Sequence, residues 1–267
     1  TAKLKELKAL PESLIALQKA ANDDSIALRD IANIVVKDPI MSVKILEAIN
    51  SPLYGLTQRV DSVSQAVTLL GKDRTVSLCV QASIGAQLSI DLAPYGLTVR
   101  NFYKIAQLRN EIAVGWFSKV SFADVPLIST SSLIGNIGQI LIAKVLKERS
   151  LDSKFTASLA SSDRLHAEIE FVGATSEDIT ADMLSIWGMN PELIDSIRYA
   201  FDLAHCPDHI KKLAIANFII FSLVPATDDI IDEYKKDSLI EFANEMNLKG
   251  DALAVIIDKI LNNQPIL

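Results

Sequence analysis

The spacing of apolar residues constrains the fold of this chain most. Apolar residues recur three and four positions apart along nearly all of the 267 residues, and no sustained apolar–polar alternation lies between hairpin turns. The first pattern places apolar side chains on one face of a helix, whereas the second would place them on one face of a strand. The sequence therefore predicts an all-α fold. Because hydrophobic residues make up 49% of the chain and charged residues 22%, we expect a large buried core.

Capping and breaking residues predict where the helices begin and end. Ser25, Thr98 and Asn190 precede apolar-periodic segments, and their side chains can accept hydrogen bonds from the free N–H groups of a first helical turn. Gly71 predicts a helix end, since glycine readily adopts positive φ. The uncharged segment from Val125 to Ala143 contains a proline and several polar residues, so we expect a buried core helix with its lead-in and no membrane span.

The charge of the chain limits its partners. A formal net charge of −7 disfavours a broad nucleic-acid-binding face, which would need clustered basic residues. The one basic cluster, Lys144, Lys147 and Arg149, is placed where basic groups complement the dipole of a helix end. The two cysteines are far apart and have neither metal nor redox spacing. No signal peptide precedes Leu4, so we expect a cytoplasmic protein that binds neither nucleic acid nor membrane.

Segments of an ordered motif occur in two regions of the sequence, one from Leu10 to Gly71 and one from Leu133 to Pro191. Its parts are Leu10 to Leu14, Lys37-Asp38-Pro39, Ile45 to Gly55, Ser62 to Gly71, Leu133 to Gln139, Gly173, and Met183 to Pro191. In this order the residues resemble the HDOD domain, a bacterial all-helical signalling module related to the HD phosphohydrolases, over roughly Leu10 to Pro225. The resemblance implies a multi-helix, HD-like bundle. It would comprise an N-terminal helical part at 1–97, a degenerate HD-like core at 98–225 and a C-terminal helical tail at 226–267.

The chain departs from the related enzymes at the residues that would bind metal. The segment at Leu133 to Gln139 is similar to the histidine–aspartate segment of HD enzymes, but Gly135 and Asn136 occupy the positions of the two ligands. Ser176 stands where the resemblance implies a later histidine, and the segment 101–119 contains none. A hydrolytic centre needs imidazole and carboxylate ligands to hold a divalent ion and acidify its water. We therefore expect no metal, no cofactor and no catalysis, with Glu168 among the residues of a vestigial cleft.

The three histidines allow an alternative site. His166, Glu168 and Glu170 could form a rebuilt metal or acid–base site, although residues two apart do not share a helix face. Glu168 could instead be a buried partner for a backbone or arginine group, whereas the preferred interpretation places both glutamates on a solvated face. His205 and His209 have the spacing of two ligands on one helix, but a proline between them disfavours an uninterrupted helix.

The turn at Asn50 to Gly55 is the best candidate for function outside the lost metal centre. Asn50 can close a helix, Ser51 leads into a proline, and Gly55 can adopt positive φ. Tyr54 would then lie on a short, constrained connection, where its ring could bind a partner or pack on the helices. The sequence leaves both roles open.

These observations favour a catalytically inactive regulatory module of a bacterial signalling pathway that acts through protein contacts. One alternative is a divergent HD-type phosphohydrolase or phosphodiesterase that uses other residues. Another is a sensor whose old cleft binds a nucleotide or small anion without hydrolysing it.

Overall fold

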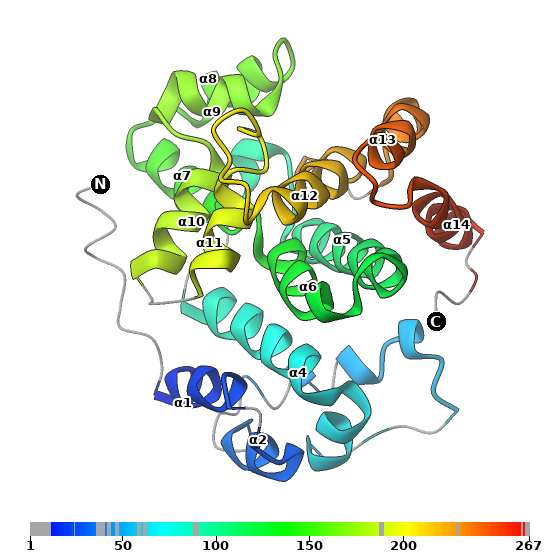
Figure 1. Cartoon of the computed structure of the whole chain (residues 1–267). Coiled ribbons are helices and arrows are strands. Elements are labelled where there is room, and N and C mark those ends of the chain that lie inside the picture. The colour runs from blue at the N-terminus through cyan, green and yellow to red at the C-terminus, as the bar shows by residue number, and fades with distance from the viewer. Residues whose placement is uncertain are drawn as a thin grey trace. The chain divides into compact units, whose positions relative to one another are not determined.

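A computed structural model describes residues 12–23, 25–35, 41, 44–45, 48–57, 60, 63–87, 91–186, 190–227, 230–262 and 264. Within these ranges the chain forms helices and turns and no strand, so the all-α prediction is confirmed (Figure 1). The α-helices are α1 (Glu12–Ala21), α2 (Leu28–Val35), α4 (Val63–Gln87), α5 (Val99–Val120), α6 (Val125–Ile134), α7 (Gly138–Glu148), α8 (Asp152–Leu159), α9 (Arg164–Val172), α10 (Ser176–Ile186), α11 (Pro191–Arg198), α12 (Lys211–Leu223), α13 (Glu233–Glu245) and α14 (Gly250–Leu261). Short 3-10 helices in the same described ranges are η2 (Pro52–Tyr54), η3 (Ala93–Tyr95) and η4 (Phe122–Asp124).

The chain divides into two compact units, Thr1–Ser89 and Ile90–Leu267. The division that we expect from the sequence, with boundaries after residues 97 and 225, stays a prediction. No helix within the described ranges is long and apolar enough to cross a membrane.

In the first unit, α1 and α2 pack on α4. Gly71 interrupts α4 with φ 76° and ψ 172°, as its sequence position predicts. The prediction for Ser25 is wrong, because α2 begins only at Leu28 and the Ser25 hydroxyl donates to Asp23 at 2.6 Å. Asp23 therefore closes a local turn with the side chain that we expected to cap the helix. Some parts of the N-terminal motif, such as Lys37 to Pro39 and Ser62, lie outside the described residues.

In the second unit, α5 runs through the core. Thr98 caps it in a capping box with Asn101, and Trp116 and Phe117 near its C-terminal end are fully buried. The indole nitrogen of Trp116 donates to the carbonyl of Leu248 at 2.7 Å and so ties α5 to the turn between α13 and α14. Figure 1 shows these two C-terminal helices side by side. A buried hydrogen bond to backbone fixes this contact more specifically than apolar packing alone.

The segment expected as one core helix is two helices, α6 and α7, separated by a turn at 135–137. Glycines allow this turn to pack closely on other helices. A Cβ at Gly135 would lie 2.3 Å from the ring of Phe221 on α12, and a Cβ at Gly138 would lie 2.1 Å from the carbonyl oxygen of Ser176 on α10. The side-chain hydroxyl of Thr180 on α10 accepts from the Gly138 N–H at 2.9 Å. Contacts with α10 and α12 thus stabilise the turn at 135–137 that separates α6 from α7.

Candidate functional site

The turn after Asn50 is fixed by its own hydrogen bonds. The Asn50 side chain donates to the Val60 carbonyl and accepts from the Val60 N–H, both at 2.7 Å. Ser51 is extended, and Gly55 adopts φ 57° while its N–H donates to the Pro52 carbonyl. The amide of Asn50 therefore closes the loop internally, and a glycine is needed at position 55 because the backbone there is left-handed.

Tyr54 is half-buried on this turn, and the guanidinium carbon of Arg74 lies 4.8 Å from the centre of its ring. This geometry is that of a cation–π contact between η2 and α4. The ring thus packs on α4 of the first unit, and the residue as a whole is partly exposed. A role of the turn in partner binding stays a proposal.

Glu168 and Ser176, two residues of the expected vestigial cleft, lie together in the second unit. Glu168 is fully buried, and its Oε2 accepts from the Ser176 N–H at 2.7 Å, while its Oε1 accepts from the Tyr95 hydroxyl at 2.9 Å. Ser176 begins α10, so the carboxylate satisfies a free N–H of that helix's first turn. The expectation of a solvated Glu168 is wrong, and the alternative of a buried partner for backbone and arginine groups is the one that the structure shows.

Arg164 is the cation of this cluster. Its Nη1 donates to Glu168 at 2.9 Å and to Glu177 at 3.0 Å, and its Nη2 donates to Glu177 at 2.7 Å. The Ser176 hydroxyl also contacts Nη1. The Arg164 side chain is 11% exposed and the two carboxylates at most 1%. A guanidinium and two carboxyl groups thus share a nearly water-free space, where each depends on its partners for stability.

Burial sets the protonation of the cluster. Burial raises the pKa of Glu168, against the attraction of Arg164, and burial together with the charge of Glu168 raises the pKa of Tyr95 well above its ordinary value. Burial alone would lower the pKa of Arg164, but Glu177 and Glu168 raise it above its ordinary value. Tyr95 therefore stays a hydrogen-bond donor and Arg164 stays a cation.

A second arginine, Arg109 on α5, is completely buried near this cluster. Its Nε donates to the Val224 carbonyl at 2.8 Å, and its guanidinium lies 4.4 Å from the centre of the Phe221 ring. Burial lowers its pKa to about 9, against the attraction of Glu177 and with the repulsion of Arg164. At neutral pH it therefore remains a cation, and the region contains two buried arginines beside the two buried glutamates.

The ring of Phe221 lies between Arg109 and the turn that carries Gly135, since it contacts both. Asn136 is fully buried, and its amide nitrogen donates to the side-chain oxygen of Gln139 at 3.3 Å. The side-chain amide nitrogen of Gln139 in turn donates to the Ala226 carbonyl at 3.0 Å. Within the described part of the chain, the Asn136 side-chain oxygen and the two terminal nitrogens of Arg109 have no hydrogen-bond partner.

The structure therefore brings the four predicted cleft residues into one buried region. Thr180 connects two of them, because its hydroxyl lies 3.2 Å from the Gly135 carbonyl and 2.7 Å from the Ser176 carbonyl. The sequence analysis missed the residues that fill this region: Tyr95, Arg109, Arg164, Glu177 and Phe221. Arg164 precedes Glu168 by four residues, a helical ion-pair spacing that could have been found, whereas the other contacts depend on the tertiary fold.

The alternative histidine sites do not assemble. Glu170 is exposed and accepts from Ser158 at 3.3 Å, away from the hydrogen bonds of Glu168. His205 lies in the turn region before α12 and contacts Asp202 at 2.7 Å, so the prediction that no continuous helix joins it to His209 is confirmed. Across the residues that the structure describes, no three His, Cys, Asp or Glu side chains are grouped so that they could hold a metal ion.

Comparison with known proteins identifies a family model and a sequence relative that match most of this chain. The family model of the HDOD domain matches residues 7–203. An uncharacterized protein of Treponema pallidum is 24% identical over 233 residues, which are 82% of this chain and 43% of that protein. The chain thus spans less than half the length of this relative.

Solved structures agree in fold. A virulence factor of Campylobacter jejuni is 25% identical with a TM-score of 0.57, and the match covers 96% of this chain and 92% of that one. A candidate signal transduction protein of Marinobacter aquaeolei has a TM-score of 0.71 at 20% identity, covering 99% and 60% of the two chains. A candidate phosphohydrolase of Shewanella amazonensis has a TM-score of 0.70 at 19% identity, covering 96% and 97%.

Proposed function

This chain belongs to the HDOD domain family, and we propose that it is a non-catalytic regulatory module of a bacterial signalling pathway. The family and the signal transduction protein among its structural neighbours support a regulatory role. The absence of catalysis, the protein partners and a cytoplasmic location are parts of this proposal. So is the expectation that neither nucleic acid nor membrane is a partner.

One observation carries the proposal: the ring of Phe221 occupies the space in front of Gly135. The Cβ of any side chain at position 135 would lie 2.3 Å from that ring. A metal-ligating side chain at this position would therefore require the ring to move. Asn136 beside it offers an uncharged amide that is engaged with Gln139. Packed apolar and neutral groups at the two positions where the resemblance to HD enzymes implies metal ligands support a module without a metal centre.

The surrounding charges support the same conclusion. Glu168 and Glu177 are the buried carboxylates of this region, and Arg164 contacts both of them directly. Arg109 adds a second buried cation beside Phe221. A metal that acidifies a bound water needs anionic ligands and an open coordination position. Here the carboxylates already contact a guanidinium group, which a divalent ion would have to displace.

The turn from Asn50 to Gly55, with Ser51 and Tyr54, is our candidate for the surface that binds a protein partner. Its backbone is held in one conformation by Asn50 and Gly55, and Tyr54 is a partly exposed aromatic residue on it. Aromatic side chains on a preorganised loop contribute strongly to interfaces, because little entropy is lost when they bind.

Two measurements test the proposal. Purified protein incubated with Mn²⁺ should hydrolyse neither bis-p-nitrophenyl phosphate nor p-nitrophenyl phosphate above buffer, and turnover that disappears in Glu168→Gln would establish the phosphohydrolase alternative instead.

The second measurement is affinity capture from lysate of the source cells with wild type, Tyr54→Ala and the control Tyr234→Ala. Tyr234 is fully exposed on α13 and matches Tyr54 in chemistry. We expect a specific partner to be lost only with Tyr54→Ala. Equal capture by all three proteins would remove the turn from the interface.

A further inference from the structure

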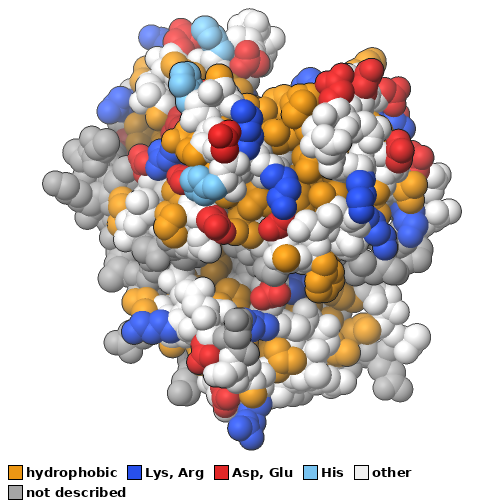
Figure 2. All heavy atoms as spheres, in the orientation of Figure 1, with side chains coloured by type: hydrophobic (Ala, Val, Ile, Leu, Met, Phe, Trp, Pro, Cys, Tyr) orange, Lys and Arg blue, Asp and Glu red, His pale blue; other side chains and the backbone are white. Residues whose placement is uncertain are grey.

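A pocket in the second unit lies beside the buried charge cluster. Its volume is about 560 Å³, within the range of small-molecule sites. The walls come from η3, from the end of α8 and the start of α9, from the end of α12 with the loop after it, and from α13. In Figure 2, hydrophobic side chains are visible between the part of the surface formed by α8 and α9 and the part formed by α13. None of the four vestigial cleft residues belongs to its lining.

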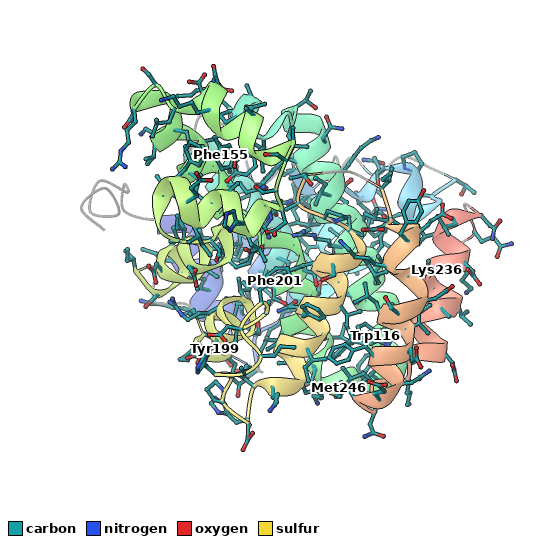
Figure 3. The ribbon with its side chains drawn as sticks, turned by 90° about the horizontal axis from the view of Figure 1, so that it is seen from above. Trp116, Phe155, Tyr199, Phe201, Lys236 and Met246 are labelled. Atoms are coloured by element: carbon teal, nitrogen blue, oxygen red, sulfur yellow. The ribbon has the colours of Figure 1, made fainter. Side chains whose placement is uncertain are left out.

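The floor of the pocket is aromatic. Phe201 and Phe221 line it with ring centres 6.3 Å apart and an angle of 35° between the ring planes. Phe201 also packs edge-to-face on Phe218 of α12 at 5.9 Å, which holds its ring in place. In Figure 3, Phe201 lies between the α8–α9 region and α12. Phe221 is only 2% exposed and supports the floor from the core side, so the partly exposed Phe201 is the ring on which a flat aromatic ligand can pack.

The pocket also contains two cations. The guanidinium of Arg164 lies 5.8 Å from the centre of the Phe201 ring, but its charge is already compensated by two carboxylates. Lys235 on α13 is 57% exposed, and its amine has one carboxylate partner, Asp232, at 3.0 Å. An exposed ion pair is weak, so a ligand anion can replace Asp232 at little cost. The one lining carboxylate, that of Asp163, caps α9 by accepting from the His166 N–H.

Two hydroxyl groups complete the lining. The side-chain hydroxyls of Ser222, at the end of α12, and Thr227, in the loop after it, form no hydrogen bond with other described residues. They can donate to or accept from polar substituents of a ring. A few placed polar groups around an apolar floor are typical of sites that select one orientation of a ligand.

We propose that this pocket binds a planar aromatic compound that carries an anionic group, with the dimensions of a ribonucleoside monophosphate. The ring of the compound packs on Phe201, which Phe221 supports from the core side, and the anion pairs with Lys235. This inference deepens the proposed function and rests on it, because the bound compound would be the signal to which the regulatory module responds.

Isothermal titration calorimetry with adenosine 5′-monophosphate, adenosine and inorganic phosphate tests the assignment. We expect the nucleotide to bind, adenosine to bind more weakly and phosphate alone not to bind. Lys235→Ala should weaken nucleotide binding about fivefold and leave adenosine binding unchanged, since only the ion pair is lost. Lys236→Ala is the matched control, because the neighbouring Lys236 is directed to Asp258 and does not line the pocket.

The floor is tested by Phe201→Leu, which should weaken nucleotide and adenosine alike. Because that variant can also lose stability, Thr227→Val provides a second test at an exposed position and should reduce nucleotide affinity while the melting temperature stays unchanged. Phosphate that binds as tightly as the nucleotide, equal effects of the two lysine variants, or no heat with any of the four ribonucleoside 5′-monophosphates would overturn the assignment.

The outcomes separate this inference from the proposed function. A nucleotide that binds and remains intact supports both. A nucleotide that binds and is hydrolysed supports the pocket and refutes the non-catalytic proposal. Absence of binding by a protein that also lacks hydrolytic activity refutes the pocket alone.

Discussion

Arg164→Met should destabilise the second unit strongly. The substitution keeps most of the apolar volume of the side chain and removes the guanidinium that donates to Glu168 at 2.9 Å and to Glu177 at 2.7 Å. Both carboxylates are buried, at 0% and 1% exposure, so they would be left without their cation and without water. Removing one partner from a buried ion pair costs about 3–5 kcal/mol, because the remaining charge is uncompensated.

This free energy corresponds to a fall in melting temperature of roughly 6 to 20 °C for a domain of this size. Thermal and urea unfolding followed by circular dichroism would measure it. Arg198→Met is the matched control, since Arg198 pairs with Asp182 at 2.8 Å with both side chains partly exposed. We expect that variant to lose less than about 1 kcal/mol.

The reasoning also predicts a pH dependence. The cost of Arg164→Met should shrink as the pH falls, because the raised pKa of Glu168 favours its neutral form, and a neutral carboxyl group needs no cation. Adding Glu168→Gln and Glu177→Gln to the variant should restore part of its stability at neutral pH. A loss no larger than that of the Arg198 variant, or one independent of pH, would refute the idea that this cluster is a desolvated ion network.

Three further predictions concern neighbouring parts of the molecule. Gly135→Ala should cost about 1–3 kcal/mol, because the new Cβ meets the Phe221 ring at 2.3 Å, and unfolding of a Gly135→Ala/Phe221→Leu double variant should show that the two changes offset one another. Because the pKa of Glu168 is raised in the folded protein, its contribution to stability is present below about pH 4.5 and is lost as the pH rises through the folded pKa. Glu168→Gln should remove this pH-dependent loss of unfolding free energy. A Glu168→Gln variant that keeps the wild-type pH profile would contradict the prediction. Asn50→Ala should cost about 2 kcal/mol in urea unfolding through its two hydrogen bonds to Val60, whereas Ser51→Ala should cost less than about 0.5 kcal/mol; equal effects would contradict the loop closure.

The helical fold could be predicted from sequence because its determinants are local. Apolar spacing places one face of each helix in the core, and the caps at Thr98 and Asn190 satisfy N–H groups two or three residues away. Gly71 is similar, since its positive φ depends on its own backbone. Ser25 failed because the neighbouring Asp23 competes for its hydroxyl and backbone N–H.

The candidate site could be predicted only in part. Gly135 and Asn136 indicate from sequence that metal ligands are missing, but Phe221, which fills the space, lies on a helix far along the chain. Glu168 was assigned to a solvated face because acidic residues are rarely buried, and only the fold brings Tyr95 and Glu177 to it. Contacts between distant segments carry no periodic signal, so the buried charge cluster could not be derived from spacing.

Metal analysis of the purified protein tests the central claim most directly. Protein prepared without chelator, and protein incubated with Mn²⁺ or Fe²⁺ and then desalted, should each contain far less than one metal ion per chain by inductively coupled plasma mass spectrometry. A stoichiometric metal that is lost in Glu168→Gln and retained in the exposed control Glu170→Gln would contradict the account, because the buried cluster would then be a metal centre and not an arginine-compensated ion network.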